Sequence, residues 1–285
     1  MSRIAYLGPA GTFTESALIQ LATAGMVPGC DRNAVRPLPI DSTPAALDAV
    51  RAGTADYACV PIENSIEGGV SPTLDSLAMD SPLQVFAETT LDVAFSIVVA
   101  PGRTAANVRT VAAHPVAAAQ VRRWLAGHLP GAELLPANSN AAAAQQVADG
   151  RADAGVSTAL AAAHRELPTL ADAVVDEPNA RTRFVLVGPP GPPPPRTGAD
   201  RTSVVLRIDN APGALVAALT EFGTRGIDLT RIESRPTRAR LGTYVFFLDC
   251  VGHIDDAAVG AALQALPDRC ADVRYLGSWP TGGPG

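Results

Sequence analysis

The sequence predicts an α/β fold in which a two-lobed domain precedes a smaller domain with the ferredoxin-like order of elements. Strand-like and helix-like segments alternate over residues 1–188, as expected for a sheet covered by helices. After a proline-rich segment, the order becomes strand, helix, strand, strand, helix, strand over residues 201–278. The change between the two patterns indicates two domains.

The first domain divides into two halves of similar layout. Its segments are expected in this order: strand 3–8, helices 14–25 and 44–53, strand 57–63, strands within 85–100, helices 114–128 and 139–150, strand 152–158, helix 157–167 and strand 183–188. We therefore expect one lobe from about residues 1–80 and 175–188 and another from about residues 81–174. A cleft between the lobes would hold a ligand beyond the carboxyl ends of the strands.

The proline-rich segment at residues 189–200 predicts a semi-rigid linker. It contains four consecutive prolines, Pro192 to Pro195, which favour extended polyproline geometry and cannot join a helix or a central strand. A surface loop within one domain is the alternative, but the new pattern after the segment favours a linker. The second domain then contains strand 201–209, helix 212–226, strands 227–238 and 242–252, helix 255–269 and a closing strand at 270–280.

Composition and charge exclude several classes of function. The 285 residues are enough for about two domains, and 47% hydrophobic against 18% charged residues favours a large core over disorder. The net charge of −6 and the lack of a basic block argue against a nucleic-acid partner. All 22 basic residues are arginine, which excludes a Walker phosphate loop, a Schiff-base lysine and a pyridoxal-phosphate site.

Neither a metal, another cofactor nor a membrane is expected from the sequence. The four cysteines lie far apart without a C-x-x-C motif, so we expect buried thiols in a reducing compartment. The four histidines show no ligand spacing. The first residues lack an apolar run of signal-peptide length, and the most apolar stretch, residues 93–100, is too short to cross a bilayer. These features predict a cytoplasmic protein.

Two loops of the first domain are candidates for ligand contact. Gly11 and Thr12 lie in GPAGTFTESA, between a strand and a helix, where free N–H groups favour an anion. The alternative is a tight turn in which Thr12 caps the helix. In PIENSIEGGV, Glu63, Asn64 and Ser65 directly follow a buried strand and would point into the cleft. The alternative there is a loop whose polar groups satisfy the backbone.

The third candidate is NARTRFVLVG, in which two arginines and a threonine precede a hydrophobic strand. Thr182 and Phe184 share one face of that strand, and Arg183 takes the other. A hydroxyl beside guanidinium groups suits a substrate with carboxylates, because arginine offers forked donors. The alternative is a strand end whose arginines are solvated.

The last domain contains a candidate site for a small zwitterion. The turn Asp209–Leu215 exposes amides that suit a carboxylate, and Asn210 offers an oxygen for an ammonium group. The strand ending in Ile232–Pro236 lies in the same domain. The alternative is helix capping plus an edge strand stopped by Pro236.

Together these motifs closely resemble the bacterial prephenate dehydratase family over essentially the whole chain. The matching motifs of the first domain are GPAGTFTESA, VPIENSIEGGV, HPVAAAQ and TRF. GAL and ESRP in the second domain are similar to the phenylalanine-binding motifs of the family's regulatory ACT domain. Each motif alone is weak, whereas all of them in this order, divided by a linker at this place, are highly specific.

The resemblance implies a cytosolic enzyme that converts prephenate to phenylpyruvate, with loss of water and carbon dioxide. It implies a catalytic domain with two lobes like a type II periplasmic binding protein, no cofactor, and a dimer or tetramer. Phenylalanine would bind between paired ACT domains. The effector residues it implies are Asn210, Ala211, Pro212, Gly213, Ala214, Leu215, Glu233, Ser234 and Arg235.

The resemblance also implies that Thr182 is the key catalytic residue. We expect its hydroxyl to donate a hydrogen bond to the leaving hydroxyl, with Glu63 as an alternative proton donor if burial raises its pKa. Arg183 would anchor a carboxylate or polarise Thr182. The expected substrate-binding residues are Asn64, Ser65, Gly11, Thr12, Gln120 and Phe184.

The sequence departs from the family pattern at two places. Ala113 and Val116 stand where the family has a serine and a glutamine, and Asn179 lies three residues before the threonine instead of two. Two other functions remain open from the sequence. One is arogenate dehydratase, which differs in the substrate side chain, and the other is a non-catalytic, amino-acid-sensing two-lobed binding protein.

Overall fold

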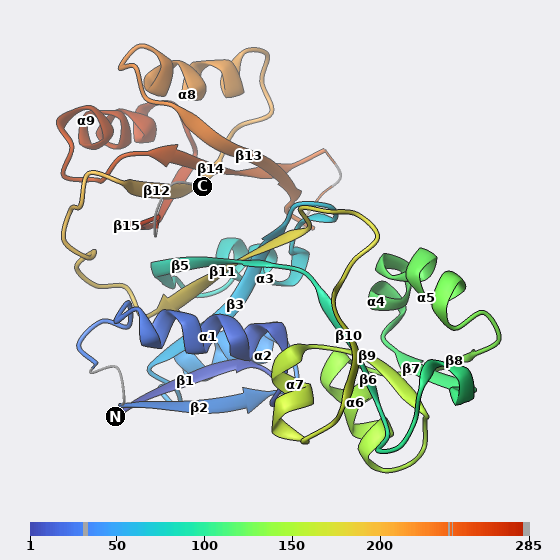
Figure 1. Cartoon of the computed structure of the whole chain (residues 1–285). Helices are drawn as coiled ribbons and strands as arrows, with labels where there is room; N and C mark the ends of the chain where they lie inside the picture. Colours follow the sequence, from blue (N-terminus) through green and yellow to red (C-terminus); the bar gives the residue numbers. More distant parts are fainter. Residues whose placement is uncertain (31–33, 239, 241, 282–285) are drawn as a thin grey trace.

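The computed structural model describes residues 1–30, 34–238, 240 and 242–281 (Figure 1). The described chain contains a six-stranded, a five-stranded and a four-stranded sheet. The first two form the two lobes of the N-terminal part, and the third forms the C-terminal domain, which lies above the first lobe in Figure 1. The predicted fold class is thereby confirmed.

The first lobe is built on the sheet with the order β2-β1-β3-β11-β5, with β4 paired to β3. Its strands are β1 (Ser2–Leu7), β2 (Val35–Ile40), β3 (Tyr57–Asn64), β4 (Gly68–Gly69), β5 (Gln84–Asp92) and β11 (Arg181–Gly188). Its helices are α1 (Phe13–Thr23), α2 (Thr43–Arg51) and α3 (Ser71–Met79). Strand β11 runs antiparallel between β3 and β5, so it is a central strand buried on both sides.

The two faces of β11 enter different cores. Phe184 and Leu186 join a cluster with residues of α1, whereas Val185 and Val187 join a cluster with residues of α2 and α3. The second cluster also contains Phe247 of the C-terminal domain. Because successive side chains of a strand point to opposite faces, β11 separates the α1 side of the sheet from the side that meets the C-terminal domain.

The second lobe has the sheet order β10-β6-β9-β7-β8. Its strands are β6 (Phe95–Val99), β7 (Thr110–Ala113), β8 (Glu133–Pro136), β9 (Ala154–Ser157) and β10 (Thr169–Val174). Its helices are η1 (Ala105–Asn107), α4 (Pro115–Gln120), α5 (Arg122–His128), α6 (Asn140–Ala148) and α7 (Ala159–His164). The expected start of this lobe near residue 81 is wrong, because β5 pairs with β11 along residues 84–92 and belongs to the first lobe.

The C-terminal domain has the sheet order β13-β14-β12-β15 with antiparallel pairing throughout. Its elements are β12 (Asp200–Arg207), α8 (Ala214–Gly223), β13 (Leu229–Pro236), β14 (Tyr244–Val251), α9 (Ala257–Ala265), η2 (Leu266–Asp268) and β15 (Asp272–Pro280). Helices α8 and α9 cover one face of this sheet, and the other face packs on the first lobe. In the described part of the chain, no helix is long and apolar enough to cross a membrane.

Candidate active site

Thr182 and Asn64 form a hydrogen-bonded pair on neighbouring strands. Thr182 of β11 lies opposite Asn64, the last residue of β3, and the Asn64 Nδ2 group donates to Thr182 Oγ1 over 2.9 Å. The Asn64 side-chain oxygen accepts the backbone N–H groups of Ile66 and Glu67, each at 2.9 Å, which defines the orientation of the amide. Thr182 Oγ1 thus accepts from Asn64, and the hydroxyl donates to no group among the described residues.

This pair lies where the chain crosses between the lobes. Ala180 and Phe184, two residues to either side of Thr182, belong to hydrophobic clusters of the second and the first lobe, respectively, and Phe13 packs against both clusters. The Val93 N–H group donates to the Ala180 carbonyl over 2.7 Å and joins the two crossing segments. Thr182 is therefore positioned at the hinge of the two lobes.

Ser65 fastens one of the crossing segments to β3. Its hydroxyl donates to the Asn179 carbonyl over 3.3 Å and accepts the Arg181 N–H group at 2.9 Å. Its own N–H group donates to the Arg181 carbonyl over 2.8 Å. These three bonds hold the segment before Thr182 in place, so Ser65 supports the start of β11 through the backbone.

A cleft of about 820 Å³ lies between the lobes. It is lined by Leu7, Gly8, Pro9, Thr12, Phe13, Thr14, Pro39, Ile40, Asp41, His114, Asn138, Ser139, Asn140 and Ala142. These residues cluster at the carboxyl ends of parallel strands, β1 and β2 in one lobe and β7 and β8 in the other. Ligands of open α/β sheets bind at this edge, as expected from the sequence.

Two helices begin at this cleft. Thr12 caps α1 by accepting the Glu15 N–H group at 3.3 Å, and Ser139 caps α6 by accepting the Ala142 N–H group at 3.0 Å. The first N–H groups of a helix have no partner within the helix, and the positive end of the helix dipole favours an anion. No arginine is among the described residues that line the cleft, so these helix ends and His114 are the groups that can offset a carboxylate.

Gly11 forms a contact between the lobes. Its N–H group donates to the Glu15 carboxylate over 2.5 Å, and its carbonyl accepts the Thr158 hydroxyl at 2.5 Å. Its φ is +92°, and a Cβ atom there would lie 2.7 Å from the Cβ of Ala161. Burial, followed by the nearby Glu15 carboxylate, raises the pKa of Tyr6 to about 12. The Gly11 amide is thus occupied by Glu15, and the glycine permits the close approach of α7.

Gln120 and Phe184 differ in how accessible they are to a ligand. Gln120 ends α4, and its backbone carbonyl accepts the Asp176 N–H group at 2.8 Å, beside a crossing segment. Its side-chain oxygen is buried without a hydrogen-bond partner among the described residues, and Gln120 is not among the residues that line the cleft. Phe184 is only 2% exposed and packs with Ile4 and Leu18 in the core of the first lobe. Phe184 therefore supports the strand and has no surface for a substrate.

Arg183 and Glu63 point away from Thr182, and the direct catalytic roles expected for them disagree with these positions. Arg183 Nη2 lies 2.9 Å from Glu63 Oε2 and 2.8 Å from Asp249 Oδ2, and Arg183 Nη1 lies 3.2 Å from Glu88 Oε2. The physical reason is strand alternation, which sends adjacent side chains to opposite faces. Burial alone lowers the pKa of Arg183, but the three carboxylates raise it above its usual value.

These side chains are part of what we term the interdomain ion network. It consists of Glu63, Glu88 and Arg183 of the first lobe and Arg201, Arg231, Glu233 and Asp249 of the C-terminal domain. Asp249 is 1% exposed, accepts the Ser203 hydroxyl at 2.7 Å and lies 2.9 Å from Arg231 Nε. Burial raises the pKa of Asp249, but Arg231 and Arg183 hold it well below its usual value.

The C-terminal domain contains a small pocket of about 110 Å³, here called the C-terminal pocket. It is lined by Ile208, Asp209, Asn210, Ala211, Ala214, Leu215, Gly242, Thr243, Tyr244 and Phe246. The predicted residues Asn210, Ala211, Ala214 and Leu215 are therefore brought together here. Pro212 and Gly213 shape the turn between them, and Gly213 has a φ of +82° at the N-cap of α8.

The ESRP motif is divided between two surfaces. Ser234 lies opposite Phe246 in the β13–β14 register and is thus next to the C-terminal pocket. Glu233 and Arg235 face the first lobe, where the Glu233 carboxylate lies against Gly69 and Arg235 Nη2 lies 3.0 Å from Asp75 Oδ1. Strand alternation explains this division, which the grouping of all three residues at one effector site did not anticipate.

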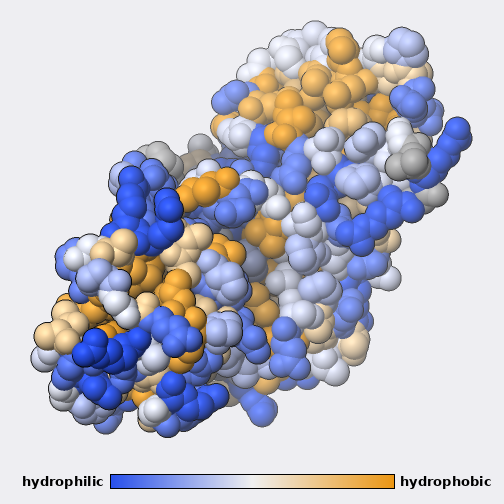
Figure 2. Space-filling view, turned by 90° about the vertical axis from the view of Figure 1, so that its right-hand side faces the viewer, coloured by the Kyte–Doolittle hydropathy of each residue, from blue (hydrophilic) through white to orange (hydrophobic). Residues whose placement is uncertain are grey.

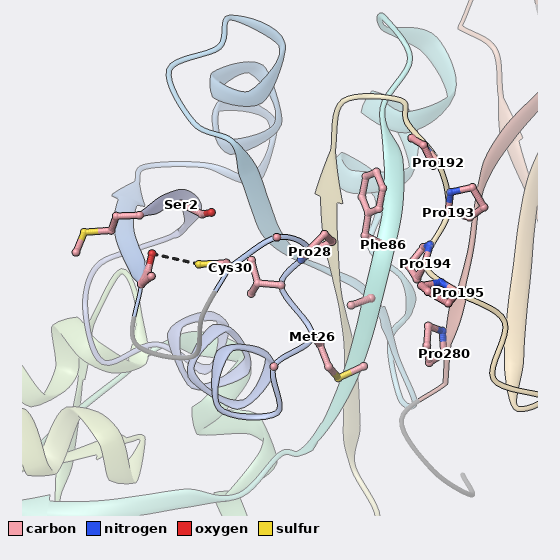
Figure 3. A pocket seen from close by; sticks show the side chains of 16 residues that line it. Ser2, Met26, Pro28, Cys30, Phe86, Pro192, Pro193, Pro194, Pro195 and Pro280 are labelled. Carbon is pink, nitrogen blue, oxygen red and sulfur yellow. Dashed lines mark hydrogen bonds between the residues drawn. The ribbon is translucent and has the colours of Figure 1, made fainter.

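Another cavity, of about 860 Å³, lies by the proline-rich segment, and Thr182 is not among the residues that line it (Figure 3). Figure 3 shows Pro192 to Pro195 on one side, with Phe86, Met26 and Cys30 around it. Among its described lining residues there is no arginine or histidine. The cavity therefore offers no side-chain cation for a substrate with carboxylates.

Sequence reasoning missed several residues that line the two sites. In the cleft these are His114, Asn138, Ser139 and Asn140, and in the C-terminal pocket Gly242, Thr243, Tyr244 and Phe246. A signal existed for the first set, since His114 and residues 138–140 each follow a short strand and precede a helix. The second set gave none, because it is the β12–β14 pairing that brings these residues beside the turn at Asp209, which follows β12.

Comparison with known proteins agrees with this geometry. The family model described as prephenate dehydratase matches residues 4–191, and the ACT domain model matches residues 202–268. Proteins named prephenate dehydratase from Mycobacterium marinum and Mycobacterium tuberculosis are each 73% identical over 282 residues. The match covers 99% of this chain and 90% and 88% of these relatives, respectively.

Solved structures give the same result with one difference in function. Prephenate dehydratase from Arthrobacter aurescens, in complex with L-Phe, is 41% identical with a TM-score of 0.89, covering 99% of this chain and 92% of that one. GqqA, described as a novel type of quorum-quenching acylase, is 30% identical with a TM-score of 0.83 and 98% coverage of both chains. With both domain models matched in order and relatives at 73% identity along nearly its whole length, the chain belongs to the prephenate dehydratase family.

Proposed function

We propose that this chain is a cytoplasmic lyase that converts prephenate to phenylpyruvate in the cleft between its lobes. The observation that carries the proposal is the hydrogen bond from Asn64 Nδ2 to Thr182 Oγ1 at the hinge. Asn64 is itself held by two backbone N–H groups, so the Thr182 hydroxyl has a fixed acceptor side and a free proton. That arrangement suits a donor to a leaving hydroxyl group.

The reaction needs few protein groups because aromatisation drives it. The bond between the ring and its carboxylate breaks, its electron pair enters the ring, and the C–O bond at the opposite carbon breaks to release hydroxide. A hydrogen bond from Thr182 stabilises the departing oxygen, and a positioned donor of this kind contributes roughly 10²–10⁴-fold. Glu63 is paired with Arg183 on the other side of the sheet and takes no part in this step.

The two carboxylates of prephenate require a positive electrostatic potential, but the ring carboxylate must not be held by a strong ion pair. The starts of α1 and α6 supply this through helix amides near Thr12 and Ser139, with His114 beside them. The side-chain carboxylate stays bound throughout, whereas the ring carboxylate leaves as carbon dioxide. Helix dipoles suit the ring carboxylate better than an ion pair does. A strong ion pair would oppose the movement of the negative charge of that carboxylate into the ring.

The test is turnover of candidate substrates by the purified chain. We expect phenylpyruvate from prephenate, followed by ultraviolet absorbance, at a kcat/KM at least about tenfold above that for arogenate. Faster turnover of arogenate would assign the chain to that substrate. Activity only on acylated quorum-sensing signals would place it functionally with GqqA, and no turnover of any substrate would favour a binding protein.

We further propose that L-phenylalanine binds at the C-terminal pocket and inhibits the enzyme. The turn at Asn210 and Gly213 offers amides for its carboxylate, and Phe246 offers an aromatic wall. Gly213→Ala should raise the inhibitory concentration about tenfold, because φ of +82° disfavours any residue with a Cβ atom. Ser234→Ala should have a smaller effect of the same sign. Unchanged inhibition in both variants would place the effector elsewhere.

A second copy of the chain would complete this pocket. Exposed apolar side chains lie around it, with Val216 66%, Ile232 52% and Tyr244 44% exposed. Figure 2 shows hydrophobic residues gathered on the upper part of the molecule, where the C-terminal domain lies. Strand β13 is an edge strand of its sheet and thus open to pairing. We expect a dimer or tetramer by analytical ultracentrifugation, and Ile232→Arg should shift it to monomers; a wild-type monomer would contradict this.

A further inference from the structure

The motifs on strands β3 and β11 lie at the interface of the catalytic and ACT domains. In each motif, adjacent side chains point to opposite faces of the sheet. On β11, Thr182 faces the hinge and Arg183 faces the ACT domain. On β3, Asn64 faces the hinge and Glu63 pairs with Arg183. The reactive pair and the ion pair therefore occupy the same two steps of the same two strands.

One of the other two partners of Arg183, Asp249, belongs to a strand that lines the C-terminal pocket. Asp249 lies on β14, which also carries Tyr244 and Phe246 of the C-terminal pocket. Asp249 Oδ2 lies 2.8 Å from Arg183 Nη2 and is 1% exposed, so water screens this pair poorly. A displacement of β14 changes the position of the carboxylate that holds Arg183.

Strand β13 also connects the surroundings of the C-terminal pocket with the interdomain ion network. Ser234 lies next to the pocket, whereas Arg231 and Glu233, on the alternate face, belong to the interdomain ion network. Arg231 binds Asp249, and Glu233 lies against Gly69, which pairs with Glu63. Strand β14, which lines the pocket, and its neighbour β13 thus both carry charged side chains of the ion network that includes Arg183.

We propose that Arg183 is a positioning residue that sets the Thr182–Asn64 pair according to the state of the ACT domain. Phenylalanine in the C-terminal pocket shifts β13 and β14, and the Arg183–Asp249 ion pair transmits that shift to β11. An effector changes activity only if it binds two states with different affinity, and this network is the element that differs between them. The inference rests on the proposed function.

The main test is Asp249→Asn, which keeps the size of the side chain and removes its charge. Phenylalanine binding, measured by calorimetry, should stay within about threefold of wild type, since Asp249 does not line the pocket. The concentration for half-inhibition should rise at least about tenfold, with the change in kcat larger than that in KM. Unchanged inhibition, or a loss of binding parallel to the loss of inhibition, overturns the proposal.

Two further variants separate coupling from general loosening of the interface. Glu233→Gln changes the network at its β13 end and should give the same uncoupling, which keeps the proposal testable if Asp249→Asn does not fold. Arg274→Gln is the matched control, because Arg274 binds the carbonyls of Leu77 and Asp80 across the same interface without touching Arg183. Equal uncoupling by Arg274→Gln overturns the proposal.

A native fluorophore reports on the network directly. Trp279 is 1% exposed, and its Nε1 group donates to Glu88 Oε2 over 3.0 Å. In a Trp124→Phe background Trp279 is the sole tryptophan, and saturating phenylalanine should alter its emission. The response should be lost in Asp249→Asn, and no response in the parent overturns the proposal. Absence of prephenate turnover by wild type would instead contradict the proposed function.

Discussion

The two faces of β11 differ in the chemistry of their surroundings: one is mainly neutral and polar, and the other is ionic. On the hinge side, Thr182 meets an amide. The cleft between the lobes, whose lining residues do not include Thr182, is lined by apolar side chains, hydroxyls, amides, His114 and Asp41, with no arginine among its described residues. On the other side, one residue along, Arg183 is surrounded by three carboxylates. The candidate substrate side thus relies mainly on hydroxyls, amides and helix ends, whereas the interface with the C-terminal domain relies on buried ion pairs.

The comparison implies different consequences of mutation on each side. Removing a neutral donor from the hinge side should slow the chemical step and leave folding intact. Removing one ion from the network leaves another buried without its partner, which destabilises the fold.

Thr182→Val tests the hinge side most directly, because valine keeps the branched shape and lacks the hydroxyl. We expect kcat for prephenate to fall about 10²–10⁴-fold with little change in the melting temperature. Thr182→Ser keeps the hydroxyl and should retain most of the activity. Near-normal turnover of a folded Thr182→Val protein would show that another group assists the leaving hydroxyl.

Asp249→Asn tests the network through its pH dependence. Asp249 is buried, but Arg231 and Arg183 lower its pKa, so it contributes stability that is present above an aspartate's usual pKa near about 4 and lost as the pH falls further. The variant should be about 3 kcal/mol less stable in urea at pH 7. That difference should shrink between about pH 4 and about pH 2. A constant difference would mean that the charge of Asp249 is not responsible.

Gly11→Ala sharpens the role of the lobe contact. The new Cβ atom would lie 2.7 Å from that of Ala161, so the lobes must separate slightly. We expect KM for prephenate to rise about tenfold, equivalent to about 1.4 kcal/mol. Gly53→Ala is the control, since Gly53 also has a positive φ, +70°, but a Cβ atom there meets nothing within 4 Å. An equal change in both variants would assign the effect to backbone strain alone.

Asp56→Asn gives the lower limit of the comparison. The Arg3–Asp56 pair resembles the network in geometry, at 2.7 Å, but its side chains are 39% and 41% exposed. Solvent screening should limit its effect on the free energy of unfolding to about 1 kcal/mol or less. A loss as large as that of Asp249→Asn in the same urea titration would contradict the role assigned to burial.

The C-terminal domain was predicted element by element, whereas the N-terminal part was predicted incompletely. Hydrophobic periodicity located many of its strands and helices, but β2, α3, β7, β8, β10 and the lobe boundary were not predicted. The error at β5 arose because a long strand carries no local mark of which sheet it joins. Its pairing with β11, more than ninety residues later in the chain, is a property of the assembled sheet.

The sequence indicated which motifs form the candidate sites more reliably than it indicated the role of each residue in them. Thr182 and Asn64 were expected near each other and do form a hydrogen bond. Alternation also indicated that Arg183 faces away from Thr182, yet nothing local in the sequence identified Asp249 as its partner. Thr12 caps α1, which was the alternative considered from the sequence, and it also lines the cleft.

Local composition and spacing were enough to indicate the family, many of the elements, the proline-rich segment and the residues able to act as donors. The tertiary structure alone decided which side of each strand meets the cleft and which meets the ACT domain. Contacts such as Arg183–Asp249 join residues 66 positions apart, and the burial of both side chains determines how strongly they interact. A short motif records which groups are available, and only the packed sheets determine what each group faces.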